Sequence, residues 1–269
     1  EPTPSAWNTL LFACIEVHQD AKILQLYSEI RKKDGMINEY SFVGVLQSCR
    51  EIGSLTLCQY LHFDIIASAC DLISWVASSL IQTYGKYAST LDSQAIFEGF
   101  EEPDIVLWTA CIQGYAGEGN AISSLCMYER LKMSGIDPDQ VSFNCILLAC
   151  SHDGLVSQCI EFFEVLIGEY KMMPQLRHYG LLVDGLGRAG DFRRLESMLM
   201  KIPMPIDVTI CVSVLTACRA HGGNIELAEE FFDRVINLAV KQEASAYILM
   251  SNIYTDAGLQ SHVTIHESE

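Results

Sequence analysis

The sequence predicts an all-α fold, a solenoid built from stacked helix–turn–helix repeats. Three observations lead to this prediction. An aromatic residue followed by apolar residues at helical spacing recurs about every 35 residues. A glycine recurs at one place downstream of that pattern, and a second apolar-periodic stretch comes after the glycine. A single hairpin cannot bury its own apolar stripe, so neighbouring hairpins are expected to stack.

The first helix of each repeat is predicted from an aromatic residue with apolar or Cys/Tyr residues three, four and seven positions later. The clearest copies begin at Trp7, Phe42, Trp108, Phe143 and Tyr179, and weaker copies occur in VASSLIQTY and TICVSVLTAC. This spacing places the side chains on one face of an amphipathic helix. With the aromatic residue at position 4, the units start at Pro4, Glu39, Ser74, Ile105, Gln140, Leu176 and Val208.

The turn and the second helix are predicted from the residues downstream of this stripe. Position 15 is glycine in five units, namely Gly53, Gly119, Gly154, Gly190 and Gly222. Glycine suits the left-handed residue that ends many helices. Stretches such as ILQLYSEI, CIEFFEVLI and LAEEFFDRVI then repeat the helical apolar spacing. Each unit is therefore expected to form two helices joined by a short turn.

The charge of the chain argues against a nucleic-acid partner. Among 269 residues, 34 are Asp or Glu and 17 are Lys or Arg, which gives a net charge of −17. Affinity for RNA or DNA comes largely from neutralised phosphates. An acidic chain is expected to bind RNA only if its charge is unevenly placed. Half of the residues are apolar, which excludes intrinsic disorder.

The cysteines indicate a reducing compartment rather than a disulfide framework or a metal site. There are 11 of them, and no Cys-x-x-Cys pair occurs. Cys14, Cys49, Cys150 and Cys218 all occupy position 11 of a unit, where other units have Tyr or Leu. We expect these four to be core residues and expect neither a metal nor a cofactor.

No enzyme motif occurs in the context that its chemistry requires. GLGRAG matches the dinucleotide-binding pattern, but it falls where a first helix ends and not between a strand and a helix. A zinc deaminase needs His-x-Glu with Cys-x-x-Cys, and neither is present. The apolar stretch 65–81 is short and is broken by Asp71, so no membrane span is predicted. We expect a protein that is not an enzyme and has no small-molecule substrate.

The repeats resemble the plant pentatricopeptide repeat (PPR) family, PLS subclass. The resemblance is carried by segments such as DIVLWTACIQGYAGEGNAISSLCMYERLKMSGIDPDQ and HYGLLVDGLGRAGD. The unit lengths then follow a P-L-S-P-L-S order, with units at 4–38, 39–73, 74–104, 105–139, 140–175 and 176–207. Residues 208–258 resemble the C-terminal E motif of that subclass, and 259–269 form a divergent tail. The family implies a right-handed superhelical solenoid of the tetratricopeptide-like helical class.

The resemblance implies a sequence-specific, single-stranded RNA-binding protein of plant mitochondria or chloroplasts. Within the subclass, the implied role is a specificity factor for C-to-U RNA editing that recruits a deaminase in trans. The sequence begins in mid-pattern without an initiator Met, so we expect a longer protein with a transit peptide outside this chain. Two alternatives stay open, an α-solenoid protein-interaction scaffold and a decayed family member.

Base recognition in the family uses position 5 and the last residue of each unit. The carried-over pairs are Asn8 with Asn38, Ser78 with Asp104, Thr109 with Asp139, and Asn144 with Gln175. The first pair resembles a pyrimidine-preferring pair, and the two Asp pairs resemble guanine-preferring ones. Val43 with Ile73 has no polar atom, and Gly180 with Asp207 gives no readable preference. Position 2 packs against the base in the family, a role that Val106 and Val141 fit.

Overall fold

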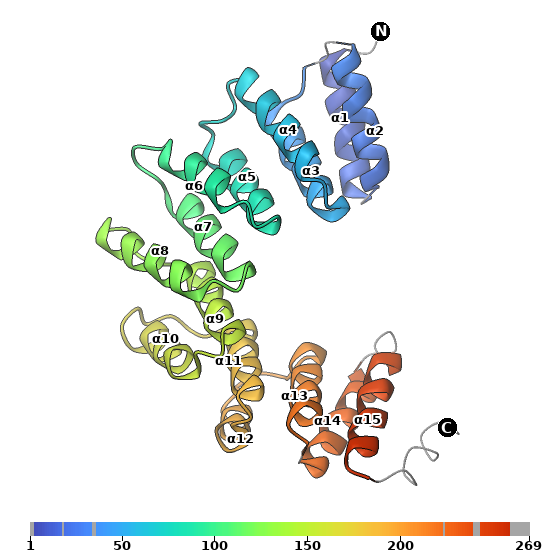
Figure 1. Ribbon diagram of the computed structural model, residues 1–269, viewed down its shortest axis with the longest axis vertical. Coiled ribbons are helices and arrows are strands. Elements are labelled where there is room, and N and C mark those ends of the chain that lie inside the picture. The colour runs from blue at the N-terminus through green and yellow to red at the C-terminus, as the bar shows by residue number, and fades with distance from the viewer. Residues whose placement is uncertain (1–2, 18, 34–35, 223, 239–242, 259–269) are drawn as a thin grey trace. The chain divides into compact units, whose positions relative to one another are not determined.

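The computed structural model describes residues 3–17, 19–33, 36–222, 224–238 and 243–258, and this part of the chain is entirely helical (Figure 1). It contains fifteen α-helices and no strand. The helices are α1 (Pro4–Glu16), α2 (Asp20–Lys32), α3 (Glu39–Ile52), α4 (Leu55–Ala67), α5 (Ser74–Lys86), α6 (Thr90–Glu98), α7 (Ile105–Gly117), α8 (Ala121–Met133), α9 (Gln140–His152), α10 (Val156–Gly168), α11 (Leu176–Arg188), α12 (Phe192–Leu199), α13 (Val208–His221), α14 (Ile225–Leu238) and α15 (Glu243–Asp256).

The chain divides into two compact units, Glu1–Ala149 and Cys150–Glu269. In the first unit, α1 packs on α2, α3 on α4, α5 on α6 and α7 on α8, and the helices α1, α3, α5 and α7 also pack on one another in that order. In the second unit, α11 and α12 pair, α13 and α14 pair, and α11, α13 and α15 pack in succession. The predicted fold, an α-solenoid of helical hairpins, is therefore the observed one.

The odd-numbered helices from α1 to α13 are the first helices of the hairpins. They begin at Pro4, Glu39, Ser74, Ile105, Gln140, Leu176 and Val208, the residues predicted as the starts of the units. Their starting points have a local cause. The residue before the helix caps it in several cases, since side-chain oxygens of Asn38, Asp104 and Asp207 each accept a bond from a backbone N–H three residues on.

Glycine ends the first helices as expected. Gly53 and Gly222 are left-handed C-caps, with φ of 81° and 53°, and each donates its N–H to the carbonyl four residues earlier. The glycines at position 15 of three further units, Gly119, Gly154 and Gly190, also have positive φ. A side chain there would be strained, which explains why the turn uses glycine.

The core lies along the predicted apolar stripes. Phe42, Val45, Leu46 and Cys49 are each at most 1% exposed. The four position-11 cysteines are all buried, which confirms their assignment to the core. Each buried side chain of this size contributes about 1.5–3 kcal/mol to folding.

One stripe residue departs from the expectation. Leu10, at position 7 of the first unit, is 43% exposed, whereas Val45 and Val214 at the same position are fully buried. Among the described helices, α1 packs only against α2 and α3. The described helices around α1 therefore leave its position 7 partly exposed.

The structure also describes the GLGRAG segment and the lengths of the apolar helices. Gly185 and Gly187 of GLGRAG lie inside α11, and Gly190 follows this helix with a φ of 70°. The strand that a dinucleotide site requires is absent from the described residues around it. Within the described ranges, the helices are too short or too polar to cross a bilayer.

Candidate functional site

The residues predicted to contact a ligand either lie in the first helices or directly precede one of them. Position 5 lies one turn into a first helix, and the last residue of the unit precedes the next first helix. Ser78, Thr109 and Asn144 are each only 7% exposed. Hydrogen bonds in the structure show how closely the members of each pair approach.

In the first unit, the two predicted residues contact each other directly. The Asn8 side-chain oxygen accepts a bond from the backbone N–H of Asn38 at 3.1 Å. The Asn38 side-chain oxygen accepts from the N–H of Ser41 at 2.9 Å. An open hollow of about 530 Å³ lies over Asn8, Asn38 and Tyr40. The pair therefore borders a space large enough for a nucleobase.

In the unit 74–104, the last residue bonds to the first one. Asp104 Oδ1 accepts from the N–H of Leu107 at 3.0 Å, and Oδ2 accepts from the Ser74 hydroxyl at 2.6 Å. Ser74 lies one helical turn before Ser78, so the predicted pair is near-adjacent. Ser74 was not among the predicted residues, although a hydroxyl at position 1 was visible in the sequence.

In the unit 105–139, a third residue joins the predicted pair. The Thr109 hydroxyl lies 3.4 Å from the Ser142 hydroxyl and donates to the Ile105 carbonyl at 2.5 Å. Ser142 in turn donates from its hydroxyl to Asp139 Oδ1 at 2.8 Å and from its N–H at 2.7 Å. Ser142 thus lies beside Thr109 and is bonded to Asp139.

The remaining pairs offer less polar surface. Val43 and Ile73 both pack against the core of the first unit. Asp207 caps α13 through the N–H of Ile210 at 3.0 Å. A Cβ at Gly180 would lie 3.3 Å from the Ile210 side chain.

Asn144 and Gln175 belong to different compact units. The Asn144 side-chain oxygen is buried without a hydrogen-bond partner. Gln175 precedes α11 and donates its backbone N–H to Nδ1 of His178 at 2.9 Å. A buried acceptor that makes no hydrogen bond lowers the free energy of unfolding.

The position-2 residues form the exposed apolar part of the site. Val106 is 45% exposed and Val141 is 52% exposed. At the same position of the neighbouring units, the rings of Tyr40 and Trp75 contact each other with centroids 4.7 Å apart. These two aromatic residues were not predicted from the sequence. Flat apolar side chains at these places can pack against the face of a base.

A ladder of polar side chains, also not predicted from the sequence, crosses three first helices. Arg50 of α3 donates to the Gln82 side-chain oxygen at 2.8 Å, and Gln82 of α5 donates to Gln113 of α7 at 3.2 Å. Lys86 pairs with Glu51 at 3.4 Å beside it. An open cavity of about 460 Å³ adjoins these residues. Gln82 and Gln113 share position 9, which was the available signal.

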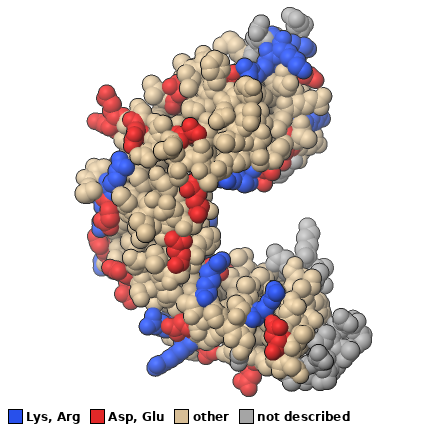
Figure 2. Space-filling view, in the orientation of Figure 1, with Lys and Arg blue, Asp and Glu red and all other residues tan. Residues whose placement is uncertain are grey.

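The charged residues are unevenly divided between the first and second helices. The seven first helices contain four acidic residues, Glu16, Glu39, Glu51 and Asp184, and five Lys or Arg residues. The seven second helices, α2 to α14, contain thirteen acidic residues and eight Lys or Arg residues. On the face in Figure 2, charged side chains are scattered among uncharged ones. The second helices therefore carry a net charge of −5 and the first helices one of +1.

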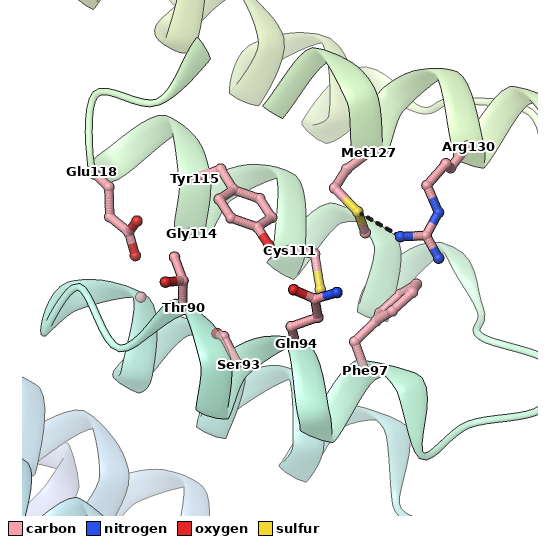
Figure 3. Close-up of a pocket in the computed structure, with 11 residues that line it drawn as sticks. Thr90, Ser93, Gln94, Phe97, Cys111, Gly114, Tyr115, Glu118, Met127 and Arg130 are labelled. Atoms are coloured by element: carbon pink, nitrogen blue, oxygen red, sulfur yellow. Dashed lines mark hydrogen bonds between the residues drawn. The ribbon is translucent and has the colours of Figure 1, made fainter. Parts of the chain in front are cut away.

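A separate cavity lies among α5, α6, α7 and α8 (Figure 3). The Arg130 guanidinium sits 5.8 Å from the centre of the Phe97 ring and 5.7 Å from that of Trp108, and it donates to the Met127 sulfur at 3.4 Å. Burial raises the pKa of the Cys111 thiol to about 12, so this thiol stays protonated near neutral pH. The cavity is a packing seam between hairpins, without an activated nucleophile among its lining residues.

No group of three or more His, Cys, Asp or Glu side chains in the described part of the chain is placed to hold a metal ion.

Comparison with known proteins identifies a repeat family. A family model described as a pentatricopeptide repeat domain matches residues 98–153, and a PPR repeat model matches residues 141–169.

Curated relatives match almost the whole chain. A pentatricopeptide repeat-containing protein of Arabidopsis thaliana, named mitochondrial, is 30% identical over 96% of this chain. Another from the same plant, named chloroplastic, is 31% identical over 96% of the chain. The chain spans 29% of the first relative and 35% of the second.

Solved structures share the fold. The crystal structure of the pentatricopeptide repeat protein PPR10 from maize aligns with a TM-score of 0.60 at 13% identity, covering 98% of this chain and 43% of PPR10. A structure of PPR10 in complex with an 18-nt psaJ RNA element aligns with a TM-score of 0.59 at 14% identity, covering 98% of this chain and 46% of that one.

Proposed function

Because the chain belongs to the pentatricopeptide repeat family, we propose that its first helices bind single-stranded RNA in a sequence-dependent manner. The observation that carries the proposal is the pairing of polar side chains. Asn8 contacts Asn38, and Ser142 lies beside Thr109 and bonds to Asp139. Repeat proteins of this kind can read one base per helical repeat with two or three side chains.

The distribution of charge supports RNA over a purely acidic scaffold surface. The first helices carry about equal numbers of acidic and basic residues, and the open cavity beside them is lined by Arg50 and Lys86 as well as by Glu51 and Glu118. Recognition then depends on hydrogen bonds and stacking more than on phosphate neutralisation, and affinity per unit is modest, about 1–3 kcal/mol for each base that is stacked.

The base preferences follow from the pairs. Asn8 with Asn38 is proposed to select a pyrimidine, cytosine over uracil. Ser78 with Asp104 and Thr109 with Asp139 are proposed to select guanine, whose N1–H and N2–H₂ groups suit a carboxylate acceptor. Asn144 and Gln175, which lie in different compact units, are each proposed to contact RNA. Val106 and Val141 are proposed to pack against base faces.

The cellular role is proposed from the family resemblance. The RNA would be a mitochondrial or chloroplast transcript, in keeping with the names of the Arabidopsis relatives. We propose that the protein marks sites for C-to-U editing and that a deaminase acts in trans, recruited through the E-motif region 208–258. In this role the chain positions RNA and performs no bond-making chemistry itself.

A selection experiment tests the proposal. The purified chain is incubated with a randomised RNA pool, and bound sequences are counted. We expect enrichment of a pyrimidine and, two and three positions downstream, two guanines. A profile identical to the input pool would refute base reading. In parallel, the purified chain is expected to contain no stoichiometric zinc and to deaminate no cytidine in the selected RNA, as elemental analysis and sequencing would reveal.

A further inference from the structure

The two aspartates proposed to read guanine, Asp104 and Asp139, differ in which of their carboxylate oxygens accept hydrogen bonds. Both precede a first helix, and in both cases Oδ1 accepts a bond from the backbone N–H three residues on. This bond serves helix capping and occupies the same oxygen in each residue. The second oxygen, Oδ2, is where the two sites diverge.

Both carboxylate oxygens of Asp104 already accept a hydrogen bond. Its Oδ2 accepts the Ser74 hydroxyl at 2.6 Å, a short bond to a charged acceptor. In Asp139, the hydroxyl and the N–H of Ser142 both bond to Oδ1, at 2.8 and 2.7 Å. Neither of these two bonds uses Asp139 Oδ2.

The cause is the residue at position 1 of each unit. Ser74 begins α5 and carries a hydroxyl toward Asp104, whereas Ile105 begins α7 and has no side-chain donor for Asp139. The helix geometry is otherwise alike, since both first helices are 13 residues long and both carry a hydroxyl residue at position 5. The side chain at position 1 is thus the difference between two units whose recognition pairs are of the same type.

We infer that Ser74 is a specificity-determining residue that masks Asp104 from the base, so that the unit 74–104 discriminates guanine less strongly than the unit 105–139. The inference rests on the proposed function. A guanine at the Asp104 site must share Oδ2 with the Ser74 hydroxyl, whose short bond already uses one lone pair of that oxygen. A guanine at the Asp139 site meets an Oδ2 that neither Ser142 bond uses.

Reciprocal variants test the inference. Ser74→Ala opens Asp104 and should raise guanine selectivity at its position about fivefold, the effect of one hydrogen bond. Ile105→Ser places a hydroxyl opposite Asp139 and should lower guanine selectivity at the neighbouring position by a similar factor. Ser74→Thr keeps the hydroxyl and is the matched control, with selectivity unchanged. Circular dichroism melting would check that each variant is folded.

Selectivity is measured as the ratio of dissociation constants for RNAs that differ only in one base. If wild-type protein prefers guanine at the Asp139 position and Ser74→Ala leaves the Asp104 position unchanged, the masking role is overturned while the proposed function stands. A loss of selectivity in Ser74→Ala would also overturn it, because Ser74 would then orient Asp104 for the base. If wild-type protein shows no base preference at either position, the proposed function fails and the inference with it.

Discussion

The first and second helices of the hairpins differ in what surrounds them. A first helix such as α7 is covered by its own second helix and by neighbouring first helices, and residues Leu107–Ile112 are all buried. A second helix such as α14 is covered on one side, and its sequence includes Glu226, Glu229, Glu230 and Asp233. Helices covered on several sides retain only a few polar residues. The comparison teaches that the few polar residues of the first helices are the candidates for ligand contact, while the second helices carry more charged residues than the first.

The largest expected effect is a difference in the rates at which the cysteine thiols react, because most of the cysteines are buried. Of the eleven cysteines, only Cys126, on the second helix α8, is exposed. At pH 8, Cys126 should react with a thiol reagent at least about 100-fold faster than the others. Burial and a pKa of about 12 for Cys111 leave very little thiolate there. Mass spectrometry after timed labelling would measure this.

Cys126→Ser is the matched control for the labelling experiment and should remove the fast phase. Cys150 and Cys159 should remain protected in that variant, since burial raises the pKa of each thiol to about 12. Rapid labelling of several cysteines in the folded protein would mean that the first helices are not packed as described.

The next effect concerns the contact between two first helices. A Cβ at Gly85 of α5 would lie 2.9 Å from the Gly114 Cα of α7, so the helices approach too closely for a side chain. Gly85→Val should lower the free energy of unfolding by about 1–3 kcal/mol through overpacking. Denaturant unfolding would measure the change.

The matched control is Gly117→Ala at the exposed end of α7, where nothing lies within 4 Å of the added Cβ. This change should be neutral or stabilise the protein by about 0.5–1 kcal/mol, because alanine is the better helix former. Equal destabilisation by both variants would contradict the close approach of α5 and α7.

A smaller effect, about tenfold, is expected on base preference. Thr109→Asn should move the preference of the unit 105–139 from guanine toward uracil, because an amide replaces the hydroxyl beside Ser142 and Asp139. Selection from the randomised RNA pool would show the shift. Thr216→Asn is the control, since Thr216 is exposed and makes the same type of bond to the carbonyl four residues earlier. An unchanged profile for Thr109→Asn would argue against base reading by this unit.

The smallest effect concerns charge. Glu51→Gln frees Lys86 from an exposed ion pair and should strengthen RNA binding about twofold at low salt. Glu230→Gln on α14 also breaks an exposed ion pair, with Arg234 at 2.7 Å, and should leave the affinity unchanged. Binding titrations at several salt concentrations would compare them. A larger gain from Glu230→Gln would place the RNA on the second helices instead.

Local features of the fold were predictable from the sequence, and contacts between helices were not. The start of each first helix depends on a cap and an apolar spacing within a few residues, as at Asn38 and Phe42. The exposure of Leu10 depends on which hairpins pack around α1, and its own repeat pattern contains no such information. The ladder from Arg50 to Gln82 joins residues 32 positions apart, so it emerges only when two helices are stacked.

The sequence by itself determined the repeat, the helical hairpins, the buried position-11 cysteines and the residue types at the predicted recognition positions. All of these depend on spacing and chemistry within one unit of the chain. Only the tertiary structure decided that Asp104 has both carboxylate oxygens bonded while the two Ser142 bonds to Asp139 share one oxygen. The physical reason is that a carboxylate can accept several hydrogen bonds. Which of them form is set by the donors that packing brings within about 3 Å.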